Sequence, residues 1–484
     1  MERKSPYPDW VNKHRKPGTE IRKMKDNYYV YEVSSFYDKE KKRGRKKTGK
    51  YLGTITENEG FKEATSIKVS KSSVAVNISR LSTKEYGMSA FIQQHCKKMM
   101  DGLKIHFPEQ WQFILVALYC RLLHTSPMKN MAYYFKRSFL SEDFAITINA
   151  NKIGTLLKEI GKDRKPITDY MYQQAEGDKF FLIDATSIIS YSKNLSQVEI
   201  GLTKDKTFGP IFNLLYFYSP HSYLPAYYRI FSGNIKDVKM VSMAIQESLY
   251  KDAIIIGDKA FYSEDNLDIL EEALLKYIIP LKRNSDLIRR ELYEDLTKSN
   301  NHFLFDERVI YYTSYPITPT RTVHLFTDEL MMANEKKDFI FRMKKHPHDY
   351  TNDKFKEHLP SFGTLSLITN ETEKSETVYL NYKSRAGIEI LFDGAKNILG
   401  NDYTYMQDDE TLEGWMFINH LALQVHHKIY SVLKTKKLLY KYSIRDFIEY
   451  LSGVKKVRIN EQWILEPMIA EQQKMLNEIG IHIP

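Results

Sequence analysis

The chain has 484 residues, of which 42% are apolar, 27% charged and 13% aromatic. This length predicts two to four domains of about 100–200 residues each, and the composition excludes an intrinsically disordered protein. The 71 Lys and Arg against 61 Asp and Glu give a net charge of +10, which admits nucleic acid as a partner without requiring it.

The sequence gives no sign of a membrane or secreted protein. The longest apolar stretch, residues 111–120, ends at Arg121, well short of the roughly 20 residues that cross a bilayer. The N-terminus lacks the apolar core of a secretory signal, so we expect a cytoplasmic protein. Cys96 and Cys120 lie in apolar helical patterns and are expected in the core, without a disulfide framework or a cysteine-based zinc site.

The N-terminal part is rich in basic residues. Residues 1–26 are polar and contain several prolines, which predicts a loosely held arm. Strand-like residues 28–33 and 50–55 flank a basic block, so we expect a β-hairpin with a cationic tip. That tip either contacts DNA phosphates or is a solvated charge run. Its basic residues are Lys41, Lys42, Arg43, Arg45, Lys46 and Lys47.

Residues 82–177 then show helical apolar spacing, which predicts a helical domain suited to duplex DNA, although helix packing alone explains the same pattern. After Gly177 the period changes to that of strands and helices in the order βββ-α-β-α-β. This order predicts the start of a ribonuclease-H-like α/β core. The strands are expected at residues 180–184, 212–218, 223–231, 253–257 and 277–281, and the helices at residues 237–250 and 263–276.

The rest of the core is expected only after a long interruption. Residues 284–377 are predicted to be a mainly β insertion, with β-like runs at 309–313, 322–327 and 339–343. A helix over residues 381–399 is expected to complete the core. A helical region over residues 412–451 and a polar, helical tail containing Trp463 are expected to follow. His426 and His427 lie in this region and are interpreted as structural, because no suitably spaced partners for a metal site are found.

Two aspartates close predicted buried strands. Asp184 follows residues 180–183, and Asp258 follows residues 253–257. A charge is costly to bury unpaired, so a carboxylate in this position is expected at the rim of the sheet. If the two strands are neighbours, the carboxylates converge, and such hard oxygen ligands suit Mg²⁺ or Mn²⁺. An aspartate in such a position, taken alone, is more often only a turn-former.

A third carboxylate is expected on the helix over residues 381–399. At about 100° per residue, Tyr382, Arg385, Glu389 and Lys396 share one face, separate from an apolar face that can pack on the sheet. An ordinary solvated polar face would look the same. Asp393 lies one turn after Glu389 and is the alternative third ligand.

These residues carry a resemblance to a known family. The spacing Tyr382-x2-Arg385-x3-Glu389-x6-Lys396 resembles the signature helix of the insertion-sequence-four group of DDE transposases. The residues Asp-Lys-Ala-Phe at 258–261 are similar to the group's motif at the second aspartate. Looser similarities occur around Asp184 and at residues 233–237, and the likeness is closest to the relatives grouped as insertion sequence sixteen-thirty-four, over residues 28–429.

The resemblance implies a ribonuclease-H-like core with a β insertion, and an enzyme that cuts DNA at element ends and joins it to target DNA. It implies that Asp184, Asp258 and Glu389 are the catalytic residues and hold two Mg²⁺ ions, or Mn²⁺. Tyr382, Arg385 and Lys396 would contact DNA. The partners would be terminal inverted repeats, target DNA and at least a second copy of the chain. The resemblance also implies a DNA hairpin step in some relatives, with a flipped base stacked on a Trp of the insertion. This insertion contains no Trp, so a Tyr, Phe or His would have to stack on the base instead.

Two alternatives remain: a transposase-derived protein that binds DNA without cutting it, and a ribonuclease-H-like nuclease or resolvase. The intact set of carboxylates and cations argues against the first, and the insertion and basic hairpin argue against the second. The predicted segments are an arm (1–26), a basic hairpin region (27–80), a helical DNA-binding domain (81–177), the first part of the core (178–283), the insertion (284–377), the second part of the core (378–429) and a helical tail (430–484).

Overall fold

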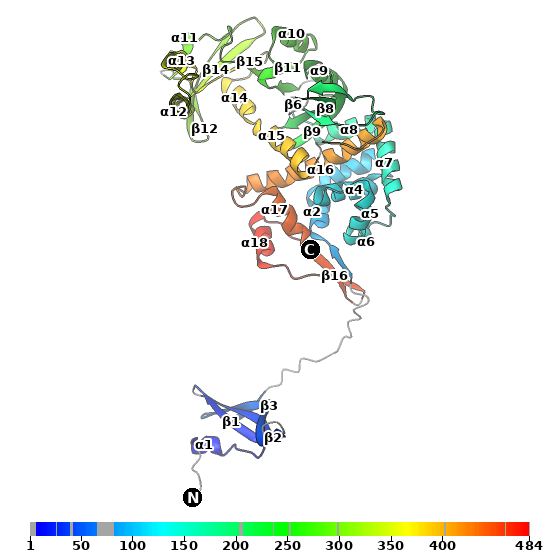
Figure 1. The fold of residues 1–484 in the computed structure, drawn as a ribbon, viewed down its shortest axis with the longest axis vertical. Helices are drawn as coiled ribbons and strands as arrows, with labels where there is room; N and C mark the ends of the chain where they lie inside the picture. Colours follow the sequence, from blue (N-terminus) through cyan, green and yellow to red (C-terminus); the bar gives the residue numbers. More distant parts are fainter. Residues whose placement is uncertain are drawn as a thin grey trace. The chain divides into compact units, whose positions relative to one another are not determined.

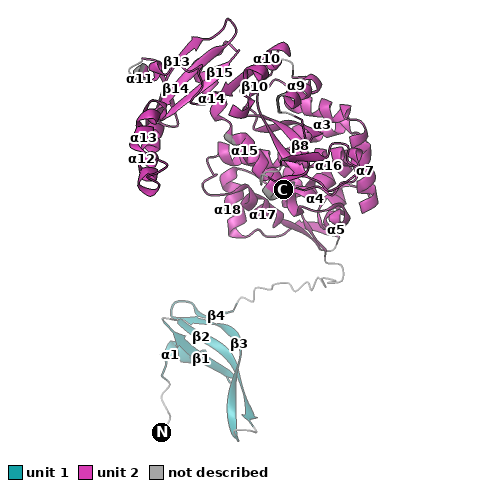
Figure 2. Ribbon diagram, turned by 45° about the horizontal axis from the view of Figure 1, so that its top comes forward, with its two compact units in different colours: residues 1–79 teal, residues 80–484 magenta. Residues whose placement is uncertain are grey.

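The computed structural model describes residues 6–25, 27–38, 42–64, 82–202, 207–235, 237–250, 253–297, 300–400, 403–459 and 461–483. It divides into two compact units, residues 1–79 and residues 80–484 (Figure 2). Within the described ranges, no helix is both long and apolar enough to cross a membrane.

The N-terminal unit is a small antiparallel sheet with one short helix. Its elements are α1 (Asp9–Asn12), β1 (Thr19–Met24), β2 (Asn27–Asp38), β3 (Arg43–Thr56) and β4 (Gly60–Glu63), with the strands in the order β1-β2-β3-β4. Val11, Ile21 and Val30 are among the residues of its core. The prediction of a loose arm over residues 1–26 is therefore wrong for the described residues 6–25. Ile21 alone is a weak strand signal, but pairing with β2 satisfies the backbone of β1 and buries this side chain.

The predicted β-hairpin is confirmed, and its strands reach further than expected. The pairing of β2 with β3 continues from Val33 opposite Thr48 to Asp38 opposite Arg43. The basic residues from Arg43 to Lys47 therefore belong to a strand, and their side chains are exposed. Lys41 lies outside the described residues.

The predicted helical region is also confirmed. The helices are α2 (Gly87–His95), α3 (Lys97–His106), α4 (Trp111–His124), α5 (Met128–Arg137), α6 (Leu140–Asp143), α7 (Ala150–Lys162) and α8 (Lys165–Gln174). The long helix α16 (Asp409–Thr435) lies against α4 and α7 (Figure 1). Glycines allow this close approach, since a Cβ at Gly414 would lie 2.1 Å from the carbonyl oxygen of Leu157.

In the described part of the second unit, ten strands form one mixed sheet. The order is β12-β13-β14-β15-β11-β10-β6-β8-β7, and β9 pairs with β8. The central strands β6, β10 and β11 are parallel. β8 runs antiparallel to β6, and β9 runs antiparallel to β8, so β9 has the same direction as β6. The strands nearest the centre are β6 (Phe180–Ile189), β7 (Glu199–Leu202), β8 (Phe208–Ser219), β9 (Leu224–Ser232), β10 (Ile254–Ile256) and β11 (Lys276–Pro280). The helices α9 (Asp237–Ser248) and α10 (Glu264–Glu272) separate the later strands, so the predicted strands and helices are found in the predicted order, with one additional strand, β7, that was not predicted.

The segment after β11 is only partly β. The strands predicted at residues 309–313 and 322–327 lie in β13 (Arg308–Pro316) and β14 (Thr322–Asp328), but the run at residues 339–343 is helical. It belongs to α12 (Glu329–Lys345), which begins where the Asp328 carboxylate accepts a hydrogen bond from the Met331 amide. This cap starts a helix that a short apolar run does not reveal. The remaining elements here are α11 (Glu291–Leu296), β12 (His302–Phe305), α13 (Asn352–His358), η3 (Leu359–Ser361) and β15 (Thr364–Thr369).

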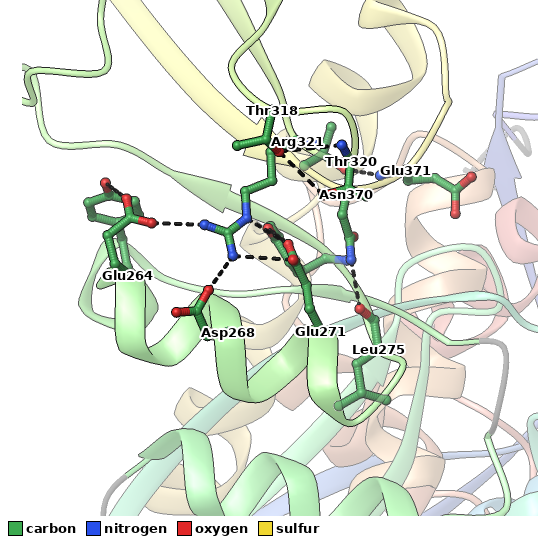
Figure 3. A network of polar contacts seen from close by, with 12 residues as sticks. Glu264, Asp268, Glu271, Leu275, Thr318, Thr320, Arg321, Asn370 and Glu371 are labelled. Atoms are coloured by element: carbon green, nitrogen blue, oxygen red, sulfur yellow. Dashed lines mark hydrogen bonds and ion pairs between the residues drawn. The ribbon is translucent and has the colours of Figure 1, made fainter.

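The inserted strands extend the central sheet, because β15 pairs antiparallel with β11. A buried arginine strengthens the junction (Figure 3). Arg321, at the turn between β13 and β14, reaches three carboxylates on α10, with 2.8 Å to Glu264, 2.5 Å to Asp268 and 2.7 Å to Glu271. The turn is thereby fixed to a helix of the core.

The C-terminal region is not purely helical. It contains α17 (Ile444–Ser452) and α18 (Ala470–Ile479), but β16 (Lys455–Ile459) and β17 (Gln462–Leu465) form a small sheet with β5 (Ser82–Glu85). Trp463 lies in β17, so the prediction of a helical tail around it is wrong. The ring of Trp463 packs against Phe139 of the helical region. This long-range contact favours the strand.

Candidate active site

Asp184 and Asp258 lie on neighbouring strands of the sheet. β6 and β10 are parallel, with Leu182 opposite Ile256, and each aspartate follows two residues after this pair. Asp258 leaves its strand and caps the short helix η2 (Lys259–Phe261), with its carboxylate accepting the Lys259 amide hydrogen bond. The structure therefore brings the two aspartates to the same level of the sheet.

Asp184 does not end its strand, contrary to the sequence prediction. β6 continues to Ile189, because its antiparallel partner β8 continues beside it and pairs Asp184 with Tyr216. On its other side β10 has already ended at Ile256. Asp184 thus lies beyond the end of β10, beside the part of β8 that continues, and its side chain is half-buried.

The predicted continuous helix over residues 381–399 is also wrong. The structure has α14 (Ser375–Lys383), a turn at residues 384–385, α15 (Ala386–Asp393) and a π-helical turn, η4 (Gly394–Ile398). Ser384 explains the interruption, because its hydroxyl donates to the carbonyl of Asn381, which a continuous helix would use for the Arg385 amide. The Arg385 amide instead bonds the carbonyl of Tyr382, 3.3 Å away, and the chain winds more tightly.

Arg385 connects this turn to the end of β10. Its Nη2 atom lies 3.5 Å from Oδ2 of Asp258, and Nη1 donates to the carbonyl of Gly257 at 3.2 Å. The guanidinium carbon lies 5.9 Å from the centre of the Tyr382 ring. Because the Arg385 side chain is only 17% exposed, these contacts form in a partly desolvated place, where charge interactions are stronger than in water.

The pKa of Tyr382 depends on burial and on the charges around its hydroxyl. Burial raises its pKa, the positive charge of Arg385 opposes this, and the negative charges of Asp258 and Glu389 raise it further. The phenol therefore lies in the field of both carboxylates. Tyr382, Arg385, Asp258 and Glu389 form one electrostatic neighbourhood, although the helix between them is broken.

Glu389 and its alternative, Asp393, have different surroundings. Both side chains are exposed. Whereas Glu389 acts on Tyr382 together with Asp258, Asp393 acts on the buried His426 of α16, whose pKa it raises against the lowering effect of burial. The two carboxylates of α15 thus interact with different residues, Glu389 with Tyr382 and Asp393 with His426.

Lys396 is half-buried, and its Nζ atom lies 5.7 Å from the centre of the Phe392 ring. It belongs to the π-helical turn, in which the Leu399 amide bonds the carbonyl of Gly394. The wider winding there, together with the tighter turn at residues 384–385, removes the single helical face that the sequence predicts for Tyr382, Arg385, Glu389 and Lys396.

The carboxylates have the donor chemistry of a Mg²⁺ or Mn²⁺ site. Among the described residues, however, no three His, Cys, Asp or Glu side chains are grouped closely enough to hold a metal ion. The backbone aligns Asp184 with Asp258, and the Tyr382 environment links Asp258 with Glu389, but the three side chains do not meet at one point in this conformation.

Two residues that position the helix were not predicted from the sequence. Gly387 lets α15 approach β8, since a Cβ there would lie 2.2 Å from the Tyr218 ring. Arg121, 5% exposed, donates to the carbonyl of Leu399 at the end of η4 and, at 3.0 Å, to Oδ1 of Asn419. A cation at a helix C-terminus is favourable, because the last carbonyls lack helical partners. In the sequence, the feature that could have indicated the role of Arg121 was its position directly after the apolar helical run of residues 111–120.

The residues expected to be structural are buried. His426 and His427 are 2% and 0% exposed, and burial lowers the pKa of His426 to about 4. Cys96 and Cys120 are free, buried thiols, and burial raises the pKa of each to about 12. These thiols are therefore unreactive at neutral pH.

Comparison with known proteins gives the class of the chain. The model of the transposase DDE domain family matches residues 176–425, slightly more than half of the sequence, and the chain belongs to this family. The match contains Asp184, Asp258 and Glu389. A structure of a piggyBac transposase synaptic complex with hairpin DNA is similar, with 13% identity, a TM-score of 0.37, and coverage of 70% of this chain and 69% of that chain. No curated protein matches the chain.

Proposed function

We propose that the protein is a transposase that cleaves DNA at the ends of a mobile element and joins those ends to target DNA. The observation that carries this proposal is the alignment of Asp184 and Asp258 on adjacent parallel strands, with Arg385 connecting Asp258 to the helix of Glu389. The strand order β11-β10-β6-β8-β9 supports a ribonuclease-H-like core. The motifs at Asp258 and at Tyr382 to Lys396 support membership of the insertion-sequence-four group, near the sixteen-thirty-four relatives.

Asp184, Asp258 and Glu389 are the catalytic carboxylates in this proposal and would hold Mg²⁺ or Mn²⁺. The bound metal would supply activation of the attacking hydroxyl and stabilisation of the leaving oxygen. Asp258 is held in place by Arg385, and its backbone is fixed by pairing with β6 and by the cap on η2. Glu389 is exposed on α15, so its side chain has room to change its conformation.

The cations near the carboxylates would bind DNA phosphates. Arg385 would contribute its positive charge, since its two Nη atoms already contact Asp258 and the carbonyl of Gly257, and Lys396 would contribute a single ammonium charge. Tyr382 would position Arg385, whose guanidinium lies beside its ring. The basic strand residues Arg43 to Lys47 would bind the duplex elsewhere, through exposed side chains.

The partners follow from the reaction. They are double-stranded DNA, as terminal inverted repeats and as target, and a second copy of the chain, because two element ends must be joined together. We place the protein in the cytoplasm with the nucleoid. The helices α2 to α8 remain our candidate for a DNA-binding domain. The division of the sequence into segments, apart from the loose arm and the helical tail, remains a prediction.

The decisive experiment mixes the full chain with DNA carrying its element's ends, a target plasmid and Mg²⁺. We expect excised and joined products. Asp184→Ala, Asp258→Ala and Glu389→Ala should each abolish cleavage while end binding is retained, because each removes one carboxylate without removing DNA-binding cations.

Asp393→Ala is the matched control, since Asp393 lies on the same helix, is equally exposed, and acts on His426 instead. Cleavage at the wild-type level by Glu389→Ala, with loss in Asp393→Ala, would reverse the assignment. Binding by the wild-type protein without cutting would show a DNA-binding derivative, and nicking without joining would show a nuclease.

A further inference from the structure

The sheet of the N-terminal unit has an inner and an outer face with different chemistry. The inner face packs Ile21, Tyr28 and Val30 on the small core. The outer face carries three tyrosines, Tyr29, Tyr31 and Tyr51, which we call the tyrosine cluster. The ring centre of Tyr51 lies 5.5 Å from that of Tyr31 and 6.1 Å from that of Tyr29. Tyr51 is 42% exposed, and the other two are half-buried.

A β-bulge creates this cluster. Val30 lies opposite Gly53, but the next residue, Tyr31, lies opposite Tyr51, so that Leu52 is the extra residue of β3. Without the bulge, the two-residue alternation of a strand would place Tyr51 on the opposite face. Gly53 has a φ of +154°, and a Cβ there would lie 2.2 Å from the carbonyl oxygen of Lys62, so this backbone requires glycine. The bulge therefore requires glycine at position 53 and brings the ring of Tyr51 to the outer face.

An arginine lies beside one of the rings. The guanidinium carbon of Arg22 lies 5.3 Å from the centre of the Tyr31 ring, and Arg22 also donates to the hydroxyl of Thr48 at 2.7 Å. Glu20 is on this face too, and it pairs with Lys46 at 2.8 Å and with Arg22 at 3.0 Å. One carboxylate is thus shared by two cations, which leaves a positive charge beside the rings.

We propose that the tyrosine cluster is a binding site for unpaired bases of single-stranded DNA. Aromatic side chains stack on bases of any sequence, and nearby cations hold the phosphates between them. Duplex DNA fits this face less well, because its bases are stacked on each other and offer only their edges. The exposed basic residues of the β2–β3 hairpin suit the duplex backbone instead.

This inference rests on the proposed function in one respect: cleavage and joining of DNA ends would provide unpaired strands near the protein. Binding itself needs neither metal nor catalysis. It is therefore measured with a chelator present, and Asp258→Ala should bind a single strand as tightly as the wild-type chain does. A failure of the cleavage assay would leave this binding result unaffected.

The test uses the full chain and fluorescence anisotropy with a short labelled oligothymidylate, and separately with a duplex of the same length. Tyr31→Leu and Tyr51→Leu should each raise the dissociation constant for the single strand at least about fivefold, the smallest effect expected when one stacked base loses its ring. Neither substitution should change duplex binding. Tyr51→Phe keeps the ring and should bind like the wild type.

Tyr37→Leu is the matched control, because Tyr37 is 64% exposed on the same strand as Tyr31 but lies near the hairpin tip, opposite Gly44. It should leave single-strand binding unchanged. Equal losses for Tyr37 and Tyr51, equal losses on duplex and single strand, or no loss for either cluster variant would overturn the proposal.

A second measurement uses the wild-type chain, so its result does not depend on whether the variants fold. An oligonucleotide containing 5-iododeoxyuridine is crosslinked by ultraviolet light, and the modified peptides are mapped by mass spectrometry. Crosslinks at Tyr29, Tyr31 or Tyr51 are expected. Crosslinks confined to residues outside the N-terminal unit would overturn the proposal, whatever the variants do.

Discussion

Arg385 makes two contacts at the end of β10 that one ammonium group cannot reproduce. It reaches the carboxylate of Asp258 with one Nη atom and the carbonyl of Gly257 with the other. Arg385→Lys keeps the charge but loses the fork, so Asp258 and the helix of Glu389 should lose their alignment. We expect cleavage to fall about a hundredfold, as for a small misplacement of reacting groups, with end binding retained.

Single-turnover cleavage on a saturating amount of element-end DNA measures this effect. Lys383→Arg, at the end of α14 and two residues before Arg385, is a control that changes one cation for the other away from Asp258. A rate for Arg385→Lys equal to that of the wild type would show that charge alone is needed there.

His426 links stability to pH. Burial lowers its pKa from the ordinary 6.5 to about 4, so the unfolded chain binds a proton first as the pH falls. Its contribution to stability is complete above pH 6.5 and is lost as the pH falls toward 4, with a slope of about 1.4 kcal/mol per pH unit.

His426→Gln should therefore lose less stability than the wild type between pH 7 and pH 5, as measured by chemical denaturation. His302→Gln, at an exposed position of β12, should follow the wild type. A pH dependence of His426→Gln identical to that of the wild-type protein would contradict the assignment of this effect to His426.

At the scale of elements, the helix after the insertion shows how local hydrogen bonds change a predicted face. Apolar spacing over residues 381–399 is helical throughout, which is why one helix is predicted. The spacing does not show that the Ser384 hydroxyl takes a main-chain carbonyl, nor that a π-helical turn follows Asp393. Both features alter the angle per residue, and the four signature side chains are therefore distributed differently from a regular helix.

Arg121 stabilises the end of this helix from another part of the fold. Arg121→Met should leave the carbonyl of Leu399 and the amide oxygen of Asn419 without their buried donor. We expect the free energy of unfolding to fall by about 1–3 kcal/mol for each such group. Denaturant unfolding measures the change, and Arg137→Met on the exposed side of α5 should stay within about 0.5 kcal/mol of the wild type.

Arg321 has a similar role for the insertion. Arg321→Met would leave Glu264, Asp268 and Glu271 close together without their shared cation. We expect faster hydrogen exchange in α10 and in the turn between β13 and β14, since mutual repulsion would loosen this junction. Arg342→Met removes exposed contacts with Asp338 and Tyr350, away from α10 and the turn, and should not change exchange in either segment. Unchanged exchange in Arg321→Met would show that strand pairing alone holds the insertion.

At the scale of the whole molecule, the exposed cations of β3 and of the turn before it predict how DNA binding depends on salt. Replacing Lys42, Arg43, Arg45, Lys46 and Lys47 by Gln should weaken duplex binding and flatten the plot of log K against log salt by about 0.9 for each phosphate that the protein no longer neutralises. Lys62→Gln in the same unit, where Lys62 pairs with Glu59, is the control. An unchanged slope in the five-residue variant would show that the basic residues of the hairpin are a solvated charge run that does not contact DNA phosphates.

Much of the fold follows from local patterns. The hairpin, the helices from α2 to α8 and the alternation of strands and helices from β6 to β11 are recognisable because each has a regular apolar period. Where pairing between distant strands determines the structure, predictions from local sequence patterns are wrong. β17 pairs with β16, whose other partner is the distant β5. β1 pairs with the adjacent β2, but its own apolar pattern is too weak to predict a strand, and the apolar run at residues 339–343 is helical because a cap lies upstream.

The sequence by itself determined which carboxylates and cations are candidates, since residue types and spacings are local information. It also placed Asp258 after a strand and Glu389 on a helix, as found. Only the tertiary structure decided that Asp184 lies inside a long strand, level with Asp258, and that Arg385 bridges from a broken helix to that level. The physical reason is that strand pairing, a competing serine hydroxyl and a glycine contact are set by neighbours far away in the chain or by bonds that apolar periodicity does not record.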